Sequence, residues 1–256
     1  MSLAPLQTEH CLEIAAASDI GQHRERNEDA IRVLPEQGIA ILSDGMGGHQ
    51  AGDVASRMAV EIIADELLNG SAATGDRVAP STDRMVDAIK TANEAIRAMS
   101  HSDPKCHGMG ATVVIAAYDN RKILAAHLGD SRLYRYWNGR LQQLTEDHTL
   151  AQRYVNAGVI EPGDAKTWFG RNMLLKGLGI DKRVEPAVTQ VNAELGQVYL
   201  LCSDGLTDAV PDDRIAEVLG RRHPSLDDAA ETLINVANEN GGPDNISVVL
   251  IRIAED

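Results

Sequence analysis

The chain has 256 residues, 43% of them hydrophobic, which is enough to fill the core of one large domain. Its 24 Lys and Arg residues against 38 Asp and Glu residues give a formal net charge of −14, which argues against nucleic acid or an anionic membrane as a partner. The three cysteines lack CxxC spacing, so neither a disulfide framework nor a structural zinc site is indicated. Because no basic segment precedes an apolar stretch at the N-terminus, and no apolar run approaches the ~20 residues that span a bilayer, we expect a cytoplasmic protein.

The first third of the chain predicts a hairpin followed by two helices. Apolar segments at residues 30–34 and 38–42 flank a Pro-Glu-Gln turn, as in a β-hairpin. Apolar residues three and four positions apart then predict one amphipathic helix over residues 54–67 and a second that begins at a cap, Ser81 or Thr82.

Strand-like segments dominate the middle of the chain. They cover residues 111–118, 122–128, 132–137 and 141–144, and we expect them to form one antiparallel meander. A short helix over residues 149–158 leads into a polar segment rich in turn-forming residues, and we interpret about 150–176 as a surface flap.

The last third alternates strands and helices. Strands are expected at residues 198–202 and 246–253, with helices near 212–220 and 225–238 between them. This order favours an α+β fold with mainly antiparallel sheets. Since no repeat, linker or low-complexity tract is found, we expect one domain over residues 1–256.

Five aspartates lie at the ends of predicted strands, and most of them adjoin glycine. Asp44, Asp130 and Asp204 follow apolar strands, whereas Asp29 and Asp244 precede strands. Carboxylates that gather at one sheet edge bind hard cations such as Mg²⁺ or Mn²⁺, and adjacent glycines let the backbone approach a ligand. A single Asp-Gly pair is more often a β-turn, and phosphatases, nucleases and simple cation sites all collect carboxylates, so placement alone specifies no reaction.

The complete sequences of the motifs around these aspartates are more specific than the positions of the aspartates alone. They are Gly21–Asp29, Asp44–His49, Gly129–Arg132, Ser203–Asp208 and Gly242–Asn245, in this order. Together they resemble the protein phosphatase 2C family, the metal-dependent protein phosphatases, in its bacterial form, over about residues 14–253. The resemblance implies a four-layer α-β-β-α sandwich of two antiparallel β-sheets flanked by helices. It also implies hydrolysis of phosphoserine and phosphothreonine in proteins by a metal-bridged hydroxide, without a phosphoenzyme.

The resemblance assigns ligands to two Mg²⁺ or Mn²⁺ ions. They are the carboxylates of Asp29, Asp44, Asp204 and Asp244 and the carbonyl of Gly45, with Asp44 bridging the ions. Glu28 matches a position that acts through metal-bound water, and Asn245 one that supports the ligands. Asp130 and Asp208 match positions that hold a third, weaker ion, although structural turn residues are an open alternative for both.

The resemblance also assigns two catalytic side chains besides Asp44. Arg24 matches the phosphate-binding arginine, whose guanidinium fork fits two phosphate oxygens. His49 matches the histidine that protonates the leaving alkoxide. From the residues alone, Arg24 could instead pair with Glu25 or Glu28 on the surface, and His49 could pack beside the start of a helix.

The flap departs from the family pattern between its ends, and Lys176 stands where an arginine is expected, so substrate preference stays open. Trp168 and Phe169 are expected to pack against the domain. Three further histidines, His107, His127 and His148, receive no assignment.

The expected partners are phosphorylated proteins and a cognate serine/threonine kinase pathway, with the enzyme a monomer. One alternative is a phosphatase devoted to a single small regulatory protein, as in partner switching. Another is a pseudophosphatase that binds phosphoproteins without hydrolysing them. The complete set of metal carboxylates argues against the pseudophosphatase.

Overall fold

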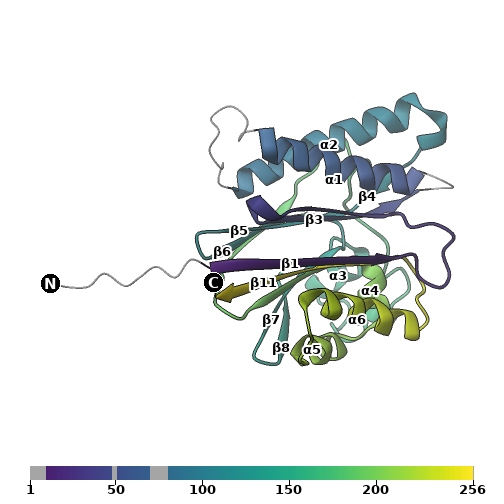
Figure 1. Ribbon diagram of the computed structural model, residues 1–256. Coiled ribbons are helices and arrows are strands. Elements are labelled where there is room, and N and C mark those ends of the chain that lie inside the picture. Colours follow the sequence, from purple (N-terminus) through teal and green to yellow (C-terminus); the bar gives the residue numbers. More distant parts are fainter. Residues whose placement is uncertain (1–9, 48–50, 70–79, 256) are drawn as a thin grey trace.

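Two antiparallel β-sheets lie face to face in the computed structural model, which describes residues 10–47, 51–69 and 80–255 (Figure 1). In spatial order, the strands of one sheet are β1 (His10–Asp19), β11 (Ile246–Glu255), β10 (Val198–Cys202), β7 (Arg132–Trp137) and β8 (Arg140–Gln143). Those of the other sheet are β2 (Asp29–Leu34), β3 (Ile39–Met46), β5 (Val113–Asp119), β6 (Lys122–Leu128) and β9 (Ala187–Asn192). The short strand β4 (Gly110–Ala111) pairs with the end of β3.

Helices cover the outer face of each sheet. The sheet that contains β3 is covered by α1 (Ala51–Asn69) and α2 (Thr82–Ser102). The sheet that contains β11 is covered by α4 (Asp204–Ala209), α5 (Asp212–Gly220) and α6 (Leu226–Glu239). The predicted four-layer α-β-β-α sandwich is therefore confirmed.

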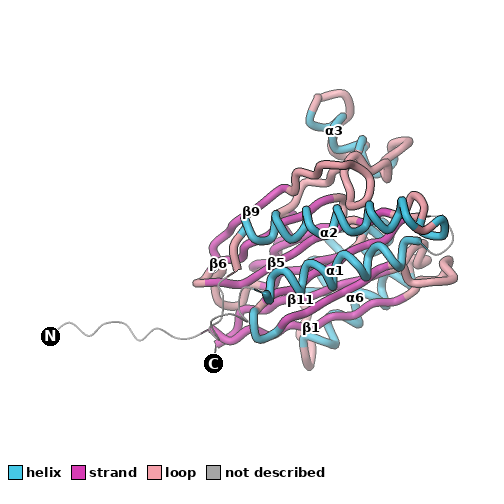
Figure 2. Tube along the Cα trace, turned by 90° about the horizontal axis from the view of Figure 1, so that it is seen from above, coloured by secondary structure: helices cyan, strands magenta, loops and turns pink. Residues whose placement is uncertain are grey.

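Between β8 and β9 the chain forms the flap, whose helix α3 (Leu150–Asn156) lies apart from the other helices at one end of the molecule (Figure 2). Short 3-10 turns occur at Pro35–Gln37, Pro104–Cys106 and Ala165–Thr167. None of the described helices is both long and apolar enough to cross a membrane.

The central strands are apolar along their length because both of their faces are covered. In β3, Ile41 faces α1 and α2, whereas the next residue, Leu42, faces the opposite sheet, and both are fully buried. Successive side chains of a strand point to opposite faces, so a strand with one face in solvent would alternate apolar and polar residues. The apolar segment of β3 ends at Ser43, and Asp44 follows where the strand leaves the core.

The predicted meander of four strands is wrong. β5 and β6 pair within one sheet, but β7 and β8 belong to the other, where Leu133 of β7 lies opposite Leu201 of β10. The chain crosses between the sheets at residues 129–131, and Gly129 adopts φ +113°, a conformation that favours glycine. An apolar pattern indicates a strand but not the sheet that the strand joins, so the sequence did not show this crossing.

Candidate metal centre and active site

Asp29 and Asp44 lie directly opposite each other on the β2–β3 hairpin. The Asp44 carbonyl accepts a hydrogen bond from the backbone N–H of Thr112 (2.8 Å), and the Thr112 hydroxyl accepts one from the N–H of Asp44 (3.1 Å). One residue further on, the N–H of Gly45 donates to the carbonyl of Glu28 (3.1 Å). The two predicted carboxylates therefore stand on a backbone that is held by its neighbours on both sides.

Asp204 and Asp244 lie beside the ends of two paired strands, β10 and β11. Asp204 is the first residue of α4, and Asp244 lies in the loop before β11. The side-chain carbonyl of buried Asn245 accepts a hydrogen bond from the N–H of Glu28 (2.8 Å), and its amide donates to the carbonyl of Arg26 (2.8 Å). Asn245 thus ties the Asp244 loop to the segment that precedes β2.

Two cavities meet at these carboxylates. The first has a volume of about 290 Å³, and its charged lining residues are Arg24, Glu28, Asp44, Asp130, Asp204 and Asp244. The second, of about 180 Å³, lies beneath the flap and is lined by Asp147, Arg171 and Asp208, among others. Asp130 and Asp204 line both cavities, so the residues expected to hold a third ion adjoin those expected to hold the first two.

The carboxylates carry more negative charge than their surroundings balance. Burial, followed by the charges of Asp29 and Asp204, raises the pKa of Asp44 well above its ordinary value of 3.8. Burial, followed by the charge of Asp130, does the same to the pKa of Asp204. Burial also raises the pKa of Asp29 to about 6 and that of Asp130 to about 7. Carboxylates this close resist ionisation unless cations lie among them.

Two buried carboxylate oxygens point to the same conclusion. Oδ1 of Asp29 and Oδ1 of Asp204 have no hydrogen-bond partner among the described residues. A buried acceptor without a partner is costly, and a cation removes that cost. The candidate ligands are all oxygen donors, which suit Mg²⁺ and Mn²⁺. The residues present therefore fit a site for divalent cations.

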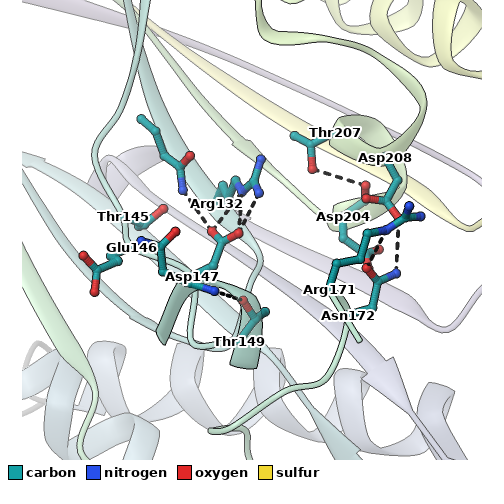
Figure 3. Close-up of polar contacts among 12 residues, drawn as sticks. Arg132, Thr145, Glu146, Asp147, Thr149, Arg171, Asn172, Asp204, Thr207 and Asp208 are labelled. Carbon is teal, nitrogen blue, oxygen red and sulfur yellow. Dashed lines mark hydrogen bonds and ion pairs between the residues drawn. The ribbon is translucent and has the colours of Figure 1, made fainter. Parts of the chain in front are cut away.

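Two of the candidate ligands, Asp244 and Asp208, form hydrogen bonds with arginines in this structure. Arg24 Nη2 donates to Oδ2 of Asp244 at 2.5 Å. On the other side, Arg171 and Asn172 of the flap donate to Oδ2 of Asp208 at 3.3 and 3.2 Å (Figure 3). As the described side chains stand, no three of His, Cys, Asp or Glu converge closely enough to enclose an ion. Cation binding would therefore exchange arginine contacts for metal–oxygen contacts.

His49, the expected proton donor, lies outside the described residues. Within the flap, Trp168 packs edge-to-face on Tyr154 of α3, with ring centroids 5.0 Å apart and an interplanar angle of 86°. The expectation that Phe169 also packs against the domain is wrong, because this residue is 93% exposed. The chain turns directly after it at Gly170, where φ is +86°, and Trp168 takes the place against α3.

Two supporting residues were not predicted from the sequence. The Thr112 hydroxyl contacts the Ser131 hydroxyl (2.6 Å) in addition to the N–H of Asp44. Asp147 accepts hydrogen bonds from Nε (2.9 Å) and Nη2 (2.6 Å) of Arg132, which fixes the end of the Gly129–Arg132 motif (Figure 3). Thr112 and Asp44 are 68 residues apart and Asp147 and Arg132 are 15 apart, so no local pattern joined them.

Buried carboxylates that gather beside an arginine, at the ends of strands from both sheets, define a site of the kind used by metal-dependent phosphoester hydrolases. The protein phosphatase 2C family profile matches residues 21–246 of the chain. The chain therefore belongs to the protein phosphatase 2C family.

Its relatives are bacterial serine/threonine phosphatases. The phosphatase stp of Listeria monocytogenes is 37% identical over 92% of this chain and 93% of its own length. PstP of Mycobacterium tuberculosis is also 37% identical, over 95% of this chain, but the chain spans only 45% of that relative. A crystal structure of the PstP catalytic domain with two manganese ions aligns with a TM-score of 0.83 at 34% identity, covering 96% of this chain and 100% of that domain.

Proposed function

We propose that this chain is a metal-dependent protein phosphatase that hydrolyses phosphoserine and phosphothreonine. The observation that carries this proposal is the convergence of Asp44 and Asp204 beside Arg24 in one cavity, with a buried oxygen of Asp204 lacking a hydrogen-bond partner among the described residues. Such a site has the charge to hold divalent cations, and its cavity of about 290 Å³ has room for a phosphate group. Membership of the protein phosphatase 2C family supports the same reaction.

The ligands in this proposal are those that the motifs assign. Two Mg²⁺ or Mn²⁺ ions would be held by Asp29, Asp44, the Gly45 carbonyl, Asp204 and Asp244, with Glu28 acting through water and with Asp130 and Asp208 holding a third ion. When bound, such ions lower the pKa of a shared water and offset charge on the phosphoryl oxygens. The manganese-containing PstP structure supports a two-ion centre here.

The remaining steps belong to side chains of the chain itself. Arg24 stands at the rim of the cavity, 47% exposed, where its guanidinium fork can turn from Asp244 to two oxygens of an incoming phosphate. Asp44, held by the backbone contacts described above, and Asp204, the first residue of α4, both line this cavity. His49 would donate the proton that the leaving serine or threonine oxygen requires.

In this proposal the chain forms one catalytic domain, acts as a monomer in the cytoplasm and opposes a serine/threonine kinase. All three cysteines are free, which agrees with a reducing compartment. The relatives named as serine/threonine phosphatases favour this function over a pseudophosphatase or a partner-switching enzyme.

Asp44→Asn tests the proposal. With an aryl phosphate and Mn²⁺, wild type should turn over and lose activity on chelation, and Asp44→Asn should lose about 10³-fold in kcat, because several kcal/mol of charge stabilisation depends on this carboxylate. Asp87→Asn is the matched control, since Asp87 is an exposed carboxylate of α2 paired with Lys90. Full turnover by chelated wild type, or activity of Asp44→Asn within a few fold of wild type, would contradict the proposal.

A further inference from the structure

His148 contacts the turn that carries Asp130 through both its side chain and its backbone. The N–H of Gly129 donates to Nδ1 of His148 at 3.1 Å, and the N–H of His148 donates to the carbonyl of Gly129 at 3.0 Å. Gly129 immediately precedes Asp130, at the point where the chain crosses from β6 in one sheet to β7 in the other. One residue therefore holds both polar groups of the backbone next to Asp130.

The backbone carbonyl of His148 contacts the C-terminal end of the flap. This carbonyl accepts a hydrogen bond from the N–H of Leu175 at 2.8 Å. The next two residues continue the contact, because Thr149 forms an isolated β-bridge with Leu174 and the N–H of Leu150 donates to the carbonyl of Met173 at 2.9 Å. His148 is thus the residue at which the flap base and the Asp130 turn meet.

The contact with Gly129 fixes the protonation of the imidazole. A backbone N–H can only donate, so Nδ1 must be the acceptor, and the ring is neutral with its proton on Nε2. The surroundings favour this form. The ring stacks on His127 with centroids 4.7 Å apart and planes at 6°. Burial, followed by the charges of His127 and Lys176, lowers the pKa of His148 to about 4.

The turn held by His148 is linked to the backbone of Asp44 through Thr112. A Cβ atom on Gly129 would lie 2.6 Å from Cβ of Thr112, so the two residues are in close contact. The Thr112 hydroxyl contacts Ser131 (2.6 Å) and accepts the N–H of Asp44 (3.1 Å). A shift of the turn would therefore move Asp130 in both of the cavities that it lines.

We propose that His148 is a positioning residue whose Nδ1 holds the Gly129–Asp130 turn against the C-terminal end of the flap and so keeps Asp130 directed at the metal centre. This inference rests on the proposed function, because the position of Asp130 matters to catalysis only if the centre holds cations. The rival role is a packing histidine, whose stacking on His127 would matter and whose hydrogen bond would not.

Two substitutions separate these roles. His148→Asn keeps a side-chain acceptor at about the place of Nδ1, whereas His148→Leu keeps apolar bulk without any acceptor. His223→Leu is the matched control, because it removes a histidine hydrogen bond to the Val218 carbonyl on α5, away from the cavities. If His148→Leu does not fold, His148→Ala serves the same comparison without added bulk.

The first measurement is hydrogen exchange of the Gly129 amide in the chelated proteins, which needs no catalysis. The second is a Mn²⁺ titration by calorimetry and by turnover of an aryl phosphate. In His148→Leu the Gly129 amide should exchange faster, and the weakest Mn²⁺ site should lose about 10-fold in affinity, the scale seen when a group supporting a ligand is removed. KM should stay within about twofold, since His148 touches no substrate.

His148→Asn should recover most of both effects, and His223→Leu should show neither. The inference is overturned if the His148→Asn and His148→Leu variants show the same changes in exchange and Mn²⁺ affinity. It is also overturned if the Gly129 amide exchanges at the wild-type rate in both variants. Failure of the proposed function would look different, because wild type itself would show no Mn²⁺-dependent turnover while the exchange result still decided the role of His148.

Discussion

Arg24 reaches Asp244 from the surface, and this exposed ion pair would cost little to break if Arg24 turned to a phosphate. The two side chains are 47% and 31% exposed, and pairs this exposed contribute at most about 1 kcal/mol. We expect Arg24→Ala to raise KM for a phosphopeptide about 10-fold, because it removes hydrogen bonds to a charged group, while kcat falls less. Arg24→Lys should recover only part of the loss, since a point charge replaces a planar fork.

Steady-state kinetics on a phosphopeptide check this expectation. Arg214→Ala on α5 is the control, since Arg214 is an exposed arginine paired with Glu217. An unchanged KM in Arg24→Ala would leave Asp244 as the functional partner of Arg24 and would remove Arg24 from the phosphate site.

His49 is testable by its dependence on the leaving group. An aryl phosphate releases a stable phenolate, whereas phosphoserine must expel a strongly basic alkoxide. If His49 donates the proton, His49→Ala should lose on the order of 10²–10⁴ in kcat on a phosphopeptide and much less on the aryl phosphate. Equal losses on the two substrates, at saturating Mn²⁺ and with folding confirmed, would indicate damage to the site instead of lost proton delivery.

The element that carries Asp204 depends on one glycine. A Cβ atom on Gly205 would lie 2.0 Å from the carbonyl oxygen of Asn245, so α4 can approach the β11 loop only without a side chain there. We expect Gly205→Ala to destabilise the fold by about 1–3 kcal/mol and to lower Tm by a few degrees. Thermal unfolding compares it with Gly163→Ala in the flap, where a Cβ meets nothing within 4 Å. Equal Tm values for the two variants would contradict the close approach.

The helices and strands that the sequence predicted are those whose apolar residues recur at a regular spacing along the chain. Helix α2 begins at Thr82 with Ser81 as its cap, one of the two caps expected, and the Ser81 side chain accepts a hydrogen bond from the N–H of Arg84. Strand β1 was not predicted, because Glu13 interrupts its apolar pattern. In the structure Glu13 lies opposite Arg252 on β11 and forms an ion pair with it. That partner is 239 residues away, which no local pattern reveals.

The same limit explains which site residues were found. Asp44 and Asp204 were visible because each follows an apolar strand in a distinctive motif, and they do share a cavity. The residues that hold the site in place act on backbone groups that are distant in sequence. Thr112 meets Asp44 where β5 pairs with β3, and His148 meets Gly129 at the crossing between the sheets. Such contacts depend on sheet pairing, which the apolar period does not encode.

Taken as a whole, the molecule has a net charge of −14, and part of its acid excess is buried at one site. In the cation-free protein Asp130 has a pKa of about 7 against an ordinary 3.8. The folded state therefore binds more protons than the unfolded chain between these values. The stability that this group contributes is fully present below about pH 4 and is lost as the pH rises to about 7.

Asp130→Asn should therefore stabilise the chelated protein, because the buried amide cannot ionise and no longer repels Asp147 and Asp204. We expect its Tm to exceed that of wild type by roughly 5 °C at about pH 8, and the gap to shrink as the pH falls toward 5. Comparing the two proteins at each pH cancels the opposite contribution of His127 and His148, whose lowered pKa values favour folding as the pH rises. Saturating Mn²⁺ should remove or reverse the gap at pH 8, since a cation then stabilises the ionised Asp130 in wild type. A chelated Asp130→Asn protein that melts no higher than wild type at pH 8 would show that the charge of Asp130 is already balanced without a cation.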